Sequence, residues 1–291
     1  MQPPCPVCTG DGERRYQLTD YDVHRCRACG QQYIWPLPDE ATVRELFRRL
    51  YTGNAPPMPE LASYYDFCFD TGPTNPLVQL YERWLAALEQ HRRPGRLLDI
   101  GCGTGLFLHV ARRRGWETLG VDECEEALAF GREQLDLDLR AGTFEALLDE
   151  GLTFDAITMW DIIEHTRTPV ALLAAARRGL APGGILGVST PNVRNVVTMV
   201  GGAAYRMTGG RVTQLLEKFY IPQHFVYFDP TTLAAALARA DLAPALMRQE
   251  STDLARLTLV PPMRLALRAL FAAGRLSGRQ TRLFSVATAR A

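Results

Sequence analysis

The chain has 291 residues, of which 47% are hydrophobic, and its 32 basic and 32 acidic side chains leave no formal net charge. This composition is ordinary for a packed globular protein, and the length suits one full α/β domain plus a small addition. No apolar stretch reaches the roughly 18 residues that a membrane span needs, and residues 1–5 lack a signal-peptide pattern. A soluble, cytoplasmic protein is therefore expected.

The neutral total hides an uneven distribution of charge. Residues 1–177 carry 18 basic and 27 acidic side chains, whereas residues 178–291 carry 14 basic and 5 acidic ones. A basic C-terminal third would favour an anionic substrate or partner. An uneven solvated surface explains the same distribution equally well.

Four cysteines near the N-terminus form two pairs, Cys5/Cys8 and Cys26/Cys29, which seventeen residues separate. This spacing is typical of a zinc ribbon, in which two tight turns aim four thiolates at one ion. The ion would stabilise a segment too small to bury a core. Two disulfides are the alternative, which the other cysteines disfavour because they lie in α/β context of cytosolic type. We therefore predict a structural Zn²⁺ in a ribbon over residues 1–35, with His24 as a solvated neighbour.

Residues 36–75 contain many prolines and are predicted to form a connector that packs on the main domain. The connector includes a short helical pattern over 41–50. It also includes an aromatic stretch over 63–67, which either closes over a site or packs in the core. A second helix is predicted over 76–90, because large apolar residues recur there at helical spacing.

The main domain, residues 76–291, is organised around residues 97–105. The apolar run Leu97–Ile100 predicts a strand buried on both faces, and it leads into glycines at 101, 103 and 105. Glycine allows positive φ and lets a ligand lie against the backbone. A helix over 106–114 would present its N–H groups and its positive dipole end to the same turn.

Two acidic residues accompany this turn. Asp99 lies two residues before the first glycine, and Asp122 ends a second predicted strand over 117–121. An acidic residue at the second place binds ribose hydroxyls in nucleotide-binding α/β folds. The turn lacks both the Gly-Lys-Ser/Thr ending of a P-loop and the glycine spacing of the dinucleotide motif. It resembles the first motif of the class I S-adenosylmethionine-dependent methyltransferases.

Strands and helices alternate downstream as in a doubly wound sheet. Strands are predicted over 137–140, 154–160, 185–189 and 283–287, and helices over 169–180 and 262–276. The helix over 262–276 is amphipathic and carries arginines. It either packs in the fold or docks on a membrane surface.

Motifs within residues 75–245 are similar to the branch of these methyltransferases that includes the ubiquinone-biosynthesis O-methyltransferases. They are F-D-A-I at 154–157, D-x-x-E-H at 161–165, L-x-P-G-G at 180–184 and S-T-P-N at 189–192. The resemblance implies an α/β fold with a Rossmann-like, seven-stranded sheet and bound S-adenosylmethionine. The implied cofactor-binding residues are Asp99, Gly101, Cys102, Gly103, Gly105, Asp122, Glu123, Thr143, Phe144 and Trp160.

Chemistry is expected after the fourth strand of this sheet. Methyl transfer from a sulfonium needs alignment and exclusion of water, and a base when the acceptor is a hydroxyl. His165 and His224 are the candidate bases, with Asp161 beside them, although a capping or core role would explain each histidine as well. Asp161, Glu164 and His165 share one face of a helical turn. The resemblance implies a divalent metal on a comparable set, and bracing of the helix is the alternative.

Residues 193–225 form an insertion long enough to be a substrate lid. Glycines provide hinges and aromatic residues an apolar face, while its basic residues are available to an anionic acceptor. These basic residues are Arg194, Arg206, Arg211 and Lys218.

These observations predict a methyltransferase that acts on a hydroxyl of a small natural-product, sugar or quinone-like molecule. N- or C-methylation of a sugar or natural-product scaffold is the first alternative. The second is a zinc-ribbon interaction protein whose α/β domain senses S-adenosylmethionine. No nucleic-acid partner is expected, because the first 30 residues are not strongly basic. The sequence says nothing of the oligomeric state.

Overall fold

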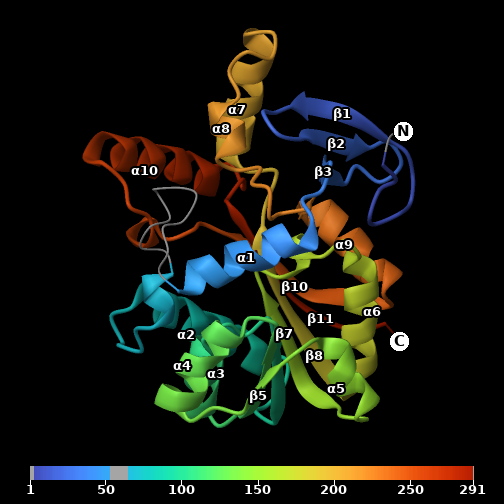
Figure 1. The fold of residues 1–291 in the computed structure, drawn as a ribbon, viewed down its shortest axis with the longest axis vertical. Coiled ribbons are helices and arrows are strands. Elements are labelled where there is room, and N and C mark those ends of the chain that lie inside the picture. Colours follow the sequence, from blue (N-terminus) through green and yellow to red (C-terminus); the bar gives the residue numbers. More distant parts are fainter. Residues whose placement is uncertain (1–2, 53–64, 291) are drawn as a thin grey trace.

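A seven-stranded sheet lies at the centre of the molecule (Figure 1), for which a computed structural model describes residues 3–52 and 65–290. The strand order is β10-β11-β8-β7-β4-β5-β6. Strand β11 runs antiparallel to both neighbours, and the other strands run parallel to one another. The strands are β4 (Arg96–Ile100), β5 (Glu117–Asp122), β6 (Leu139–Ala141), β7 (Phe154–Trp160), β8 (Leu180–Pro191), β10 (Leu242–Glu250) and β11 (Arg282–Ala289). The predicted α/β class and seven-stranded sheet are confirmed.

Helices cover both faces of this sheet, as doubly wound connections require. One face packs against α2 (Pro76–Glu89), α3 (Leu106–Arg113) and α4 (Glu125–Leu135). The other packs against α5 (Phe144–Asp149), α6 (Pro169–Gly179) and α9 (Pro230–Arg239). Successive residues of one strand serve opposite cores: Leu97 belongs to the first and Leu98 to the second, and neither is exposed. The predicted apolar run over 97–100 is therefore buried on both faces because the strand lies between two separate cores.

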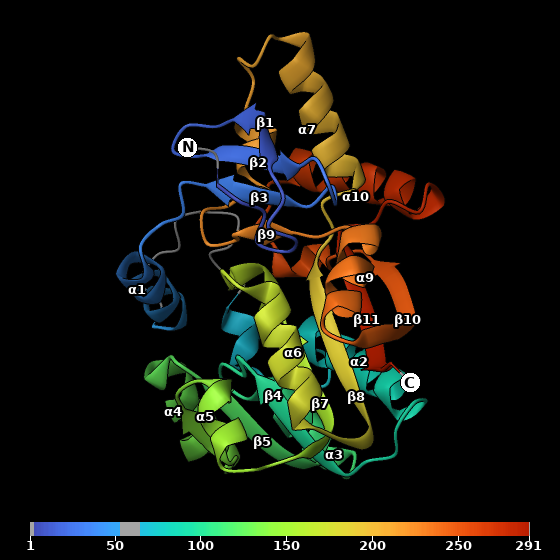
Figure 2. The ribbon, with the colours of Figure 1, turned by 90° about the vertical axis from the view of Figure 1, so that its right-hand side faces the viewer.

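A second, four-stranded sheet lies above the first, with the order β1-β2-β3-β9 (Figure 2). Its first three strands come from the N-terminal segment and its fourth from far along the chain. They are β1 (Gly12–Gln17), β2 (Asp22–Cys26), β3 (Gln32–Trp35) and β9 (Val226–Tyr227). Gln32 pairs with Tyr227 and Tyr33 with Val226. The cysteine-containing segment therefore completes its sheet with a strand that follows the insertion over 193–225.

The insertion forms α7 (Val196–Met207) and α8 (Gln214–Glu217), which stand beside the four-stranded sheet (Figures 1 and 2). Tyr16 of β1 packs against Tyr205 of α7, with ring centroids 5.1 Å apart, and against Tyr220 at 5.8 Å. The Thr19 hydroxyl donates to Glu217 Oε1 at 2.7 Å. The insertion is therefore anchored on the N-terminal segment.

The remaining helices lie around the top of the molecule. Helix α1 (Glu40–Tyr51) crosses in front of the sheet, and α10 (Pro261–Leu276) packs near α7 (Figure 1). Short 3-10 turns are η2 (Asp66–Cys68), η3 (Ile163–His165) and η4 (Leu254–Arg256). Residues 53–64 of the connector lie outside the described residues, and with them half of its prolines and the start of the aromatic stretch over 63–67. Among the described helices, none combines the length and apolar character needed to cross a bilayer.

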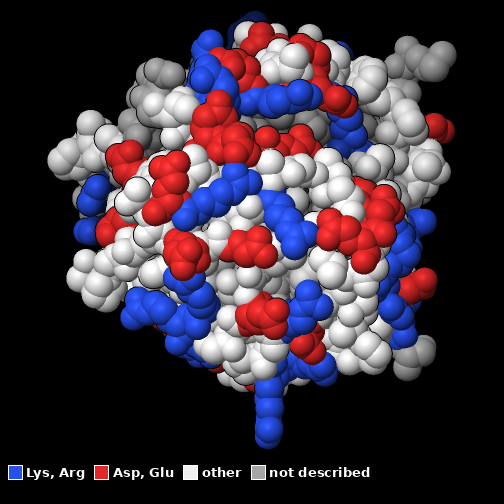
Figure 3. Space-filling model, turned by 60° about the horizontal axis from the view of Figure 1, so that its bottom comes forward, with Lys and Arg blue, Asp and Glu red and all other residues white. Residues whose placement is uncertain are grey.

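The charges on the face formed by the lower end of the sheet are mixed (Figure 3). Acidic and basic side chains intersperse there, and no continuous patch of one sign covers that face. Arg114 illustrates the pattern, because it pairs with Glu82 at 2.7 Å and also with Glu89. The acidic excess of residues 1–177 therefore produces no single-sign surface on this side.

The packing of the insertion on the four-stranded sheet predicts a stability effect at Tyr220. Its buried hydroxyl donates to Gln32 Oε1 at 2.7 Å. Tyr220→Phe leaves a buried amide oxygen without this donor, so we expect the free energy of unfolding to fall by about 1–3 kcal/mol in urea denaturation. Tyr205→Phe is the control: its hydroxyl accepts from Gln17 N at an exposed position, and a change within about 0.5 kcal/mol is expected. Equal losses in both variants would contradict the role of the buried bond.

Candidate functional site

A cavity of about 1250 Å³ opens at the carboxyl ends of β4, β5 and β7. Ligands of open α/β sheets bind at this edge, outside the strand ends. Ile100, Asp122 and Trp160 line the cavity from the three strands. Most of its other walls are apolar or aromatic, and α1 forms one of them. The cavity is therefore both at the expected place and large enough for two small molecules.

The glycine turn after β4 has the predicted conformation. Gly101, Gly103 and Gly105 have φ values of +69°, +53° and +75°. A Cβ on Gly101 would lie 2.1 Å from Ile162 Cδ1, so a larger residue would clash as well as being strained. Gly105 is the N-cap of α3. Gly101 and Cys102 line the cavity, whereas Gly103 and Gly105 shape the turn behind it.

Both acidic residues of the motif line the cavity. Asp122 Oδ2 accepts from Gly103 N at 2.9 Å and its Oδ1 from Cys124 N at 2.8 Å. These bonds fix the carboxylate and leave further lone pairs for a ligand. The Thr158 hydroxyl donates to Asp99 Oδ1 at 2.6 Å. Burial raises the pKa of Asp122, and it raises that of Asp99 to about 8.

The remaining residues of the expected cofactor set differ in exposure. Glu123, Thr143, Phe144 and Trp160 all line the cavity. Phe144 is nevertheless 2% exposed and packs mainly in the core. Trp160 packs at a tilt against Trp84, with ring centroids 4.6 Å apart, and this contact fixes the orientation of its ring.

Asp161 directly follows β7 and adopts a left-handed conformation, with φ +57°. Its carboxylate accepts a hydrogen bond from Arg282 of β11, whose Nη2 also donates to Ser189 Oγ at 3.0 Å. Such backbone strain in a non-glycine residue persists where surrounding contacts over-determine it, and it clusters at functional sites. The ion pair thus holds the β7 turn in one geometry at the cavity wall.

The two candidate histidines lie together in the cavity wall. The His165 and His224 rings pack edge to face with centroids 4.7 Å apart. His165 Nδ1 lies 2.7 Å from the Gln223 carbonyl oxygen. A carbonyl oxygen only accepts, so Nδ1 carries the proton and Nε2 keeps a lone pair. Burial lowers the pKa of His165, and it lowers the pKa of His224 further. Both rings are therefore uncharged at neutral pH.

Glu164 lies behind the histidines and is 1% exposed. The Thr190 hydroxyl donates to its Oε2 at 2.8 Å. Burial, with the charge of Asp161, raises the pKa of Glu164 to about 8. Ligand atoms of Glu164, His165 and His224 all lie within 4.8 Å of one another, so this set could hold a metal ion. Asp161, which the sequence placed in such a set, instead pairs with Arg282.

Two segments cover the cavity. Phe47 of α1 packs edge to face on His165 with centroids 5.0 Å apart, and Tyr51 lines the wall near the glycine turn. The insertion contributes Lys218 and Phe219. Of the four basic residues expected to face an acceptor, Lys218 alone is in the cavity lining, while the three arginines of the insertion lie elsewhere.

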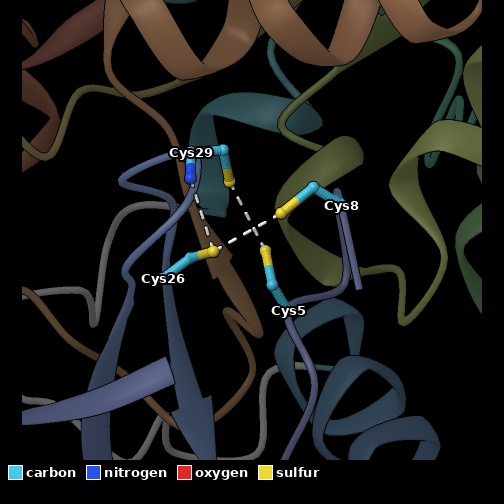
Figure 4. A group of neighbouring side chains, drawn as sticks. All are labelled: Cys5, Cys8, Cys26 and Cys29. Atoms are coloured by element: carbon cyan, nitrogen blue, oxygen red, sulfur yellow. Dashed lines mark hydrogen bonds between the residues drawn. The ribbon is translucent and has the colours of Figure 1, made fainter. Parts of the chain in front are cut away.

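The four N-terminal cysteines converge on one point (Figure 4). The Sγ atoms of Cys5 and Cys29 are 3.7 Å apart and those of Cys8 and Cys26 are 3.4 Å apart, and no disulfide joins them. All four sulfurs lie within 4.8 Å of one another. Zn–S bonds of about 2.3 Å place the sulfurs of a tetrahedral site about 3.8 Å apart, so the donor set fits Zn²⁺. His24, expected to be solvated, is instead 6% exposed and stacks on Tyr33.

The cysteine-containing sheet is joined to the histidine site through the backbone. Ile34 N donates to Phe225 O at 3.1 Å, and Phe225 N donates to Glu164 O at 2.7 Å. The loop that carries Gln223 and His224 is therefore held by β3, and both residues lie beside His165.

Sequence reasoning missed several cavity residues. Phe47 and Tyr51 lie four positions apart on α1, a spacing that marks an apolar stripe on a helix and was a usable signal. Arg282 and Arg256 come from strand and turn segments near the C-terminus that carry no motif. Only the folded sheet brings these two residues to the cavity.

The chain is similar in sequence to known methyltransferases. Residues 76–245 match a family model described as a methyltransferase domain. The ubiquinone biosynthesis O-methyltransferase of Dinoroseobacter shibae is 37% identical over 172 residues, which are 51% of this chain and 69% of that protein. That of Roseobacter denitrificans is 36% identical over 141 residues, 46% of this chain and 56% of that protein. The chain thus spans little more than half of the second relative.

Solved structures share the fold at low sequence identity. A magnesium protoporphyrin IX methyltransferase from Synechocystis, solved with bound SAH, has a TM-score of 0.55 at 15% identity and covers 87% of this chain and all (100%) of its own. A SAM-dependent methyltransferase from Archaeoglobus fulgidus has a TM-score of 0.53 at 18% identity, covering 77% of this chain and 99% of its own.

Proposed function

The chain belongs to the methyltransferase-domain family, and from this premise we propose that it transfers a methyl group from S-adenosylmethionine to a hydroxyl of a small molecule. The proposal rests mainly on the environment of His165 in the cavity wall. This histidine is uncharged, its Nδ1 donates to Gln223 O, and its Nε2 has a free lone pair. The names of the two relatives support oxygen as the acceptor atom. N- or C-methylation uses the same donor site and remains the alternative.

The donor would lie along the strand ends. Asp122 would accept from both ribose hydroxyls, the turn at Gly101 and Cys102 would contact the methionine part, and Thr143 and Phe144 would flank the adenine. Asp99 would lie near the positively charged amino-acid end. A cation beside that carboxyl favours its ionised form, which offsets the effect of burial on its pKa.

The acceptor would lie between the donor and the two histidines. Phe47, Phe219 and Phe225 line this part of the cavity, and such walls suit a ring-containing, quinone-like molecule. Bound S-adenosylmethionine would supply the methyl group, with its sulfur as the leaving atom, and His165 Nε2 would take the proton that the acceptor hydroxyl loses. Helix α1 and the insertion over 193–225 would exclude water.

A divalent metal is the second interpretation of the same side chains. Glu164, His165 and His224 would be its ligands, because their donor atoms lie within 4.8 Å of one another. A metal beside the acceptor would favour the ionised hydroxyl without a base. Activity lost to a chelator and restored by Mg²⁺ would support this interpretation over the base.

We propose a structural role for the cysteine cluster, with one Zn²⁺ on Cys5, Cys8, Cys26 and Cys29. Four thiolates close the coordination sphere and leave no open position for chemistry. The ion would stabilise β1–β3 and, through β9, the loop that carries His224.

The ribose contact predicts an effect on donor binding. Asp122→Asn removes the charge and one of the two acceptor oxygens, so the Kd for S-adenosylmethionine in calorimetry should rise at least roughly tenfold, about 1.4 kcal/mol. Asp138→Asn makes the same change at an exposed site of the sheet edge and should leave the Kd within about twofold. Equal affinities of the two variants would contradict the assignment.

The base assignment predicts a pH profile. Because burial lowers the pKa of His165 below 6.5, the ring stays unprotonated through neutral pH. At saturating substrates kcat should be flat near pH 7 and fall only below about pH 6.5. His165→Asn should lower kcat by about 10²–10⁴ with donor affinity unchanged, whereas the exposed His91→Asn should not. An acid limb above pH 6.5, or full kcat in His165→Asn, would count against the base.

The cysteine cluster predicts a metal content. We expect one zinc per chain by elemental analysis, and its loss in Cys8→Ser with a fall of roughly 5 °C or more in Tm. Cys124→Ser changes a cysteine outside the cluster and should keep both the zinc and the Tm. Equal zinc in the two variants would refute the site.

A further inference from the structure

A second pocket, of about 590 Å³, lies between α2, residues 251–255 and α10. Two residues, Thr252 and Phe271, line both this pocket and the larger cavity, so the two spaces adjoin. Arg83 of α2 and Arg264, Arg268 and Arg275 of α10 line the second pocket. Four arginines thus line one small space, which we call the arginine pocket.

Three of these arginines come from one side of α10. At 100° per residue, positions 264, 268 and 275 lie within about 40° of one another. Phe271 lies on the same side and is 7% exposed, whereas Leu265 and Leu276 are 67% and 92% exposed. Of the three arginines, Arg264 is half-buried and Arg268 and Arg275 are exposed, so they border the buried side of the helix.

The charges of the arginine pocket are not balanced within the part of the chain that the structure describes. None of Arg83, Arg264, Arg268 and Arg275 forms an ion pair with a described carboxylate there. Asp253 is the one acidic residue of the lining, and its Oδ1 accepts from Ala255 N at 2.8 Å. Arg83 Nη1 donates to the Gln79 carbonyl at 3.1 Å. Four like charges that line one pocket repel one another, so a bound anion would relieve the repulsion.

The number and kind of donors indicate the anion. A carboxylate has one charge and two oxygens, enough for one guanidinium fork. A phosphate has close to two charges and three terminal oxygens, and a diphosphate has more, which matches several forks at once. Hydroxyl-bearing Ser251 and Thr252 add polar groups to the same wall.

We propose that the arginine pocket binds a phosphate or diphosphate group. Because the pocket adjoins the larger cavity at Thr252 and Phe271, a soluble small molecule that carries this group is one source. A lipid headgroup phosphate is the other, since the exposed Leu265 and Leu276 lie on the same helix. The inference concerns a second site and does not depend on methyl transfer.

The test is a calorimetric titration of the full chain with sodium pyrophosphate at constant ionic strength. We expect wild-type binding and a Kd at least tenfold higher in the double variant Arg264→Gln/Arg268→Gln. Arg239→Gln on α9 removes one exposed positive charge outside the pocket and should stay within twofold of wild type. The Kd for S-adenosylmethionine, measured on each variant, reports that the fold and the first cavity are intact.

A second arm distinguishes the two sources. Each variant is sedimented with vesicles of phosphatidylglycerol and phosphatidylcholine, and with vesicles of phosphatidylcholine alone. Arginine-dependent binding of pyrophosphate supports a soluble ligand, and arginine-dependent binding only to phosphatidylglycerol supports a headgroup. The proposal is overturned if the double variant matches wild type in both arms, or if Arg239→Gln loses as much binding as the double variant.

Discussion

The pairing of β3 with β9 is the contact on which the arrangement of the site depends. Only two residue pairs form it, yet β9 continues from the loop that carries Gln223 and His224. Gln31 Nε2 reinforces the junction by donating to Tyr227 O at 2.7 Å. A small N-terminal sheet thereby fixes a loop that comes about 190 residues later in the chain. The Zn²⁺ proposed for the cysteine cluster would stabilise that sheet and would act on the site through this contact.

Different kinds of contact form the two ends of the cavity. At the end where we propose that the donor binds, the central sheet and its two cores fix the carboxyl ends of parallel strands, a glycine turn and Asp122. At the histidine end, the Asp161–Arg282 pair, the Gln223 carbonyl and α1 come from separate parts of the chain. One end fixed by the sheet and a second end assembled from separate segments is an arrangement in which one fold can serve many acceptors.

The sequence predicted best what is local and periodic. The strand predicted over 154–160 has those bounds in the structure, and the helix predicted over 76–90 ends one residue earlier. It did not predict β9 or β10, because β9 has two residues and most of β10 is half-exposed with no clean alternation. Asp161 and Arg282 could not be paired from spacing, since they are 121 residues apart. The histidine end of the cavity is made of such long-range contacts, so the sequence predicted more of the glycine-turn end than of the histidine end.

A structure of the protein with bound S-adenosylhomocysteine tests the central claim most directly. We expect the ribose hydroxyls on the Asp122 carboxylate and the sulfur directed toward His165, with room for an acceptor beneath Phe47. A ligand bound with its ribose away from Asp122, or with its sulfur facing a wall that excludes both His165 and His224, would contradict the account.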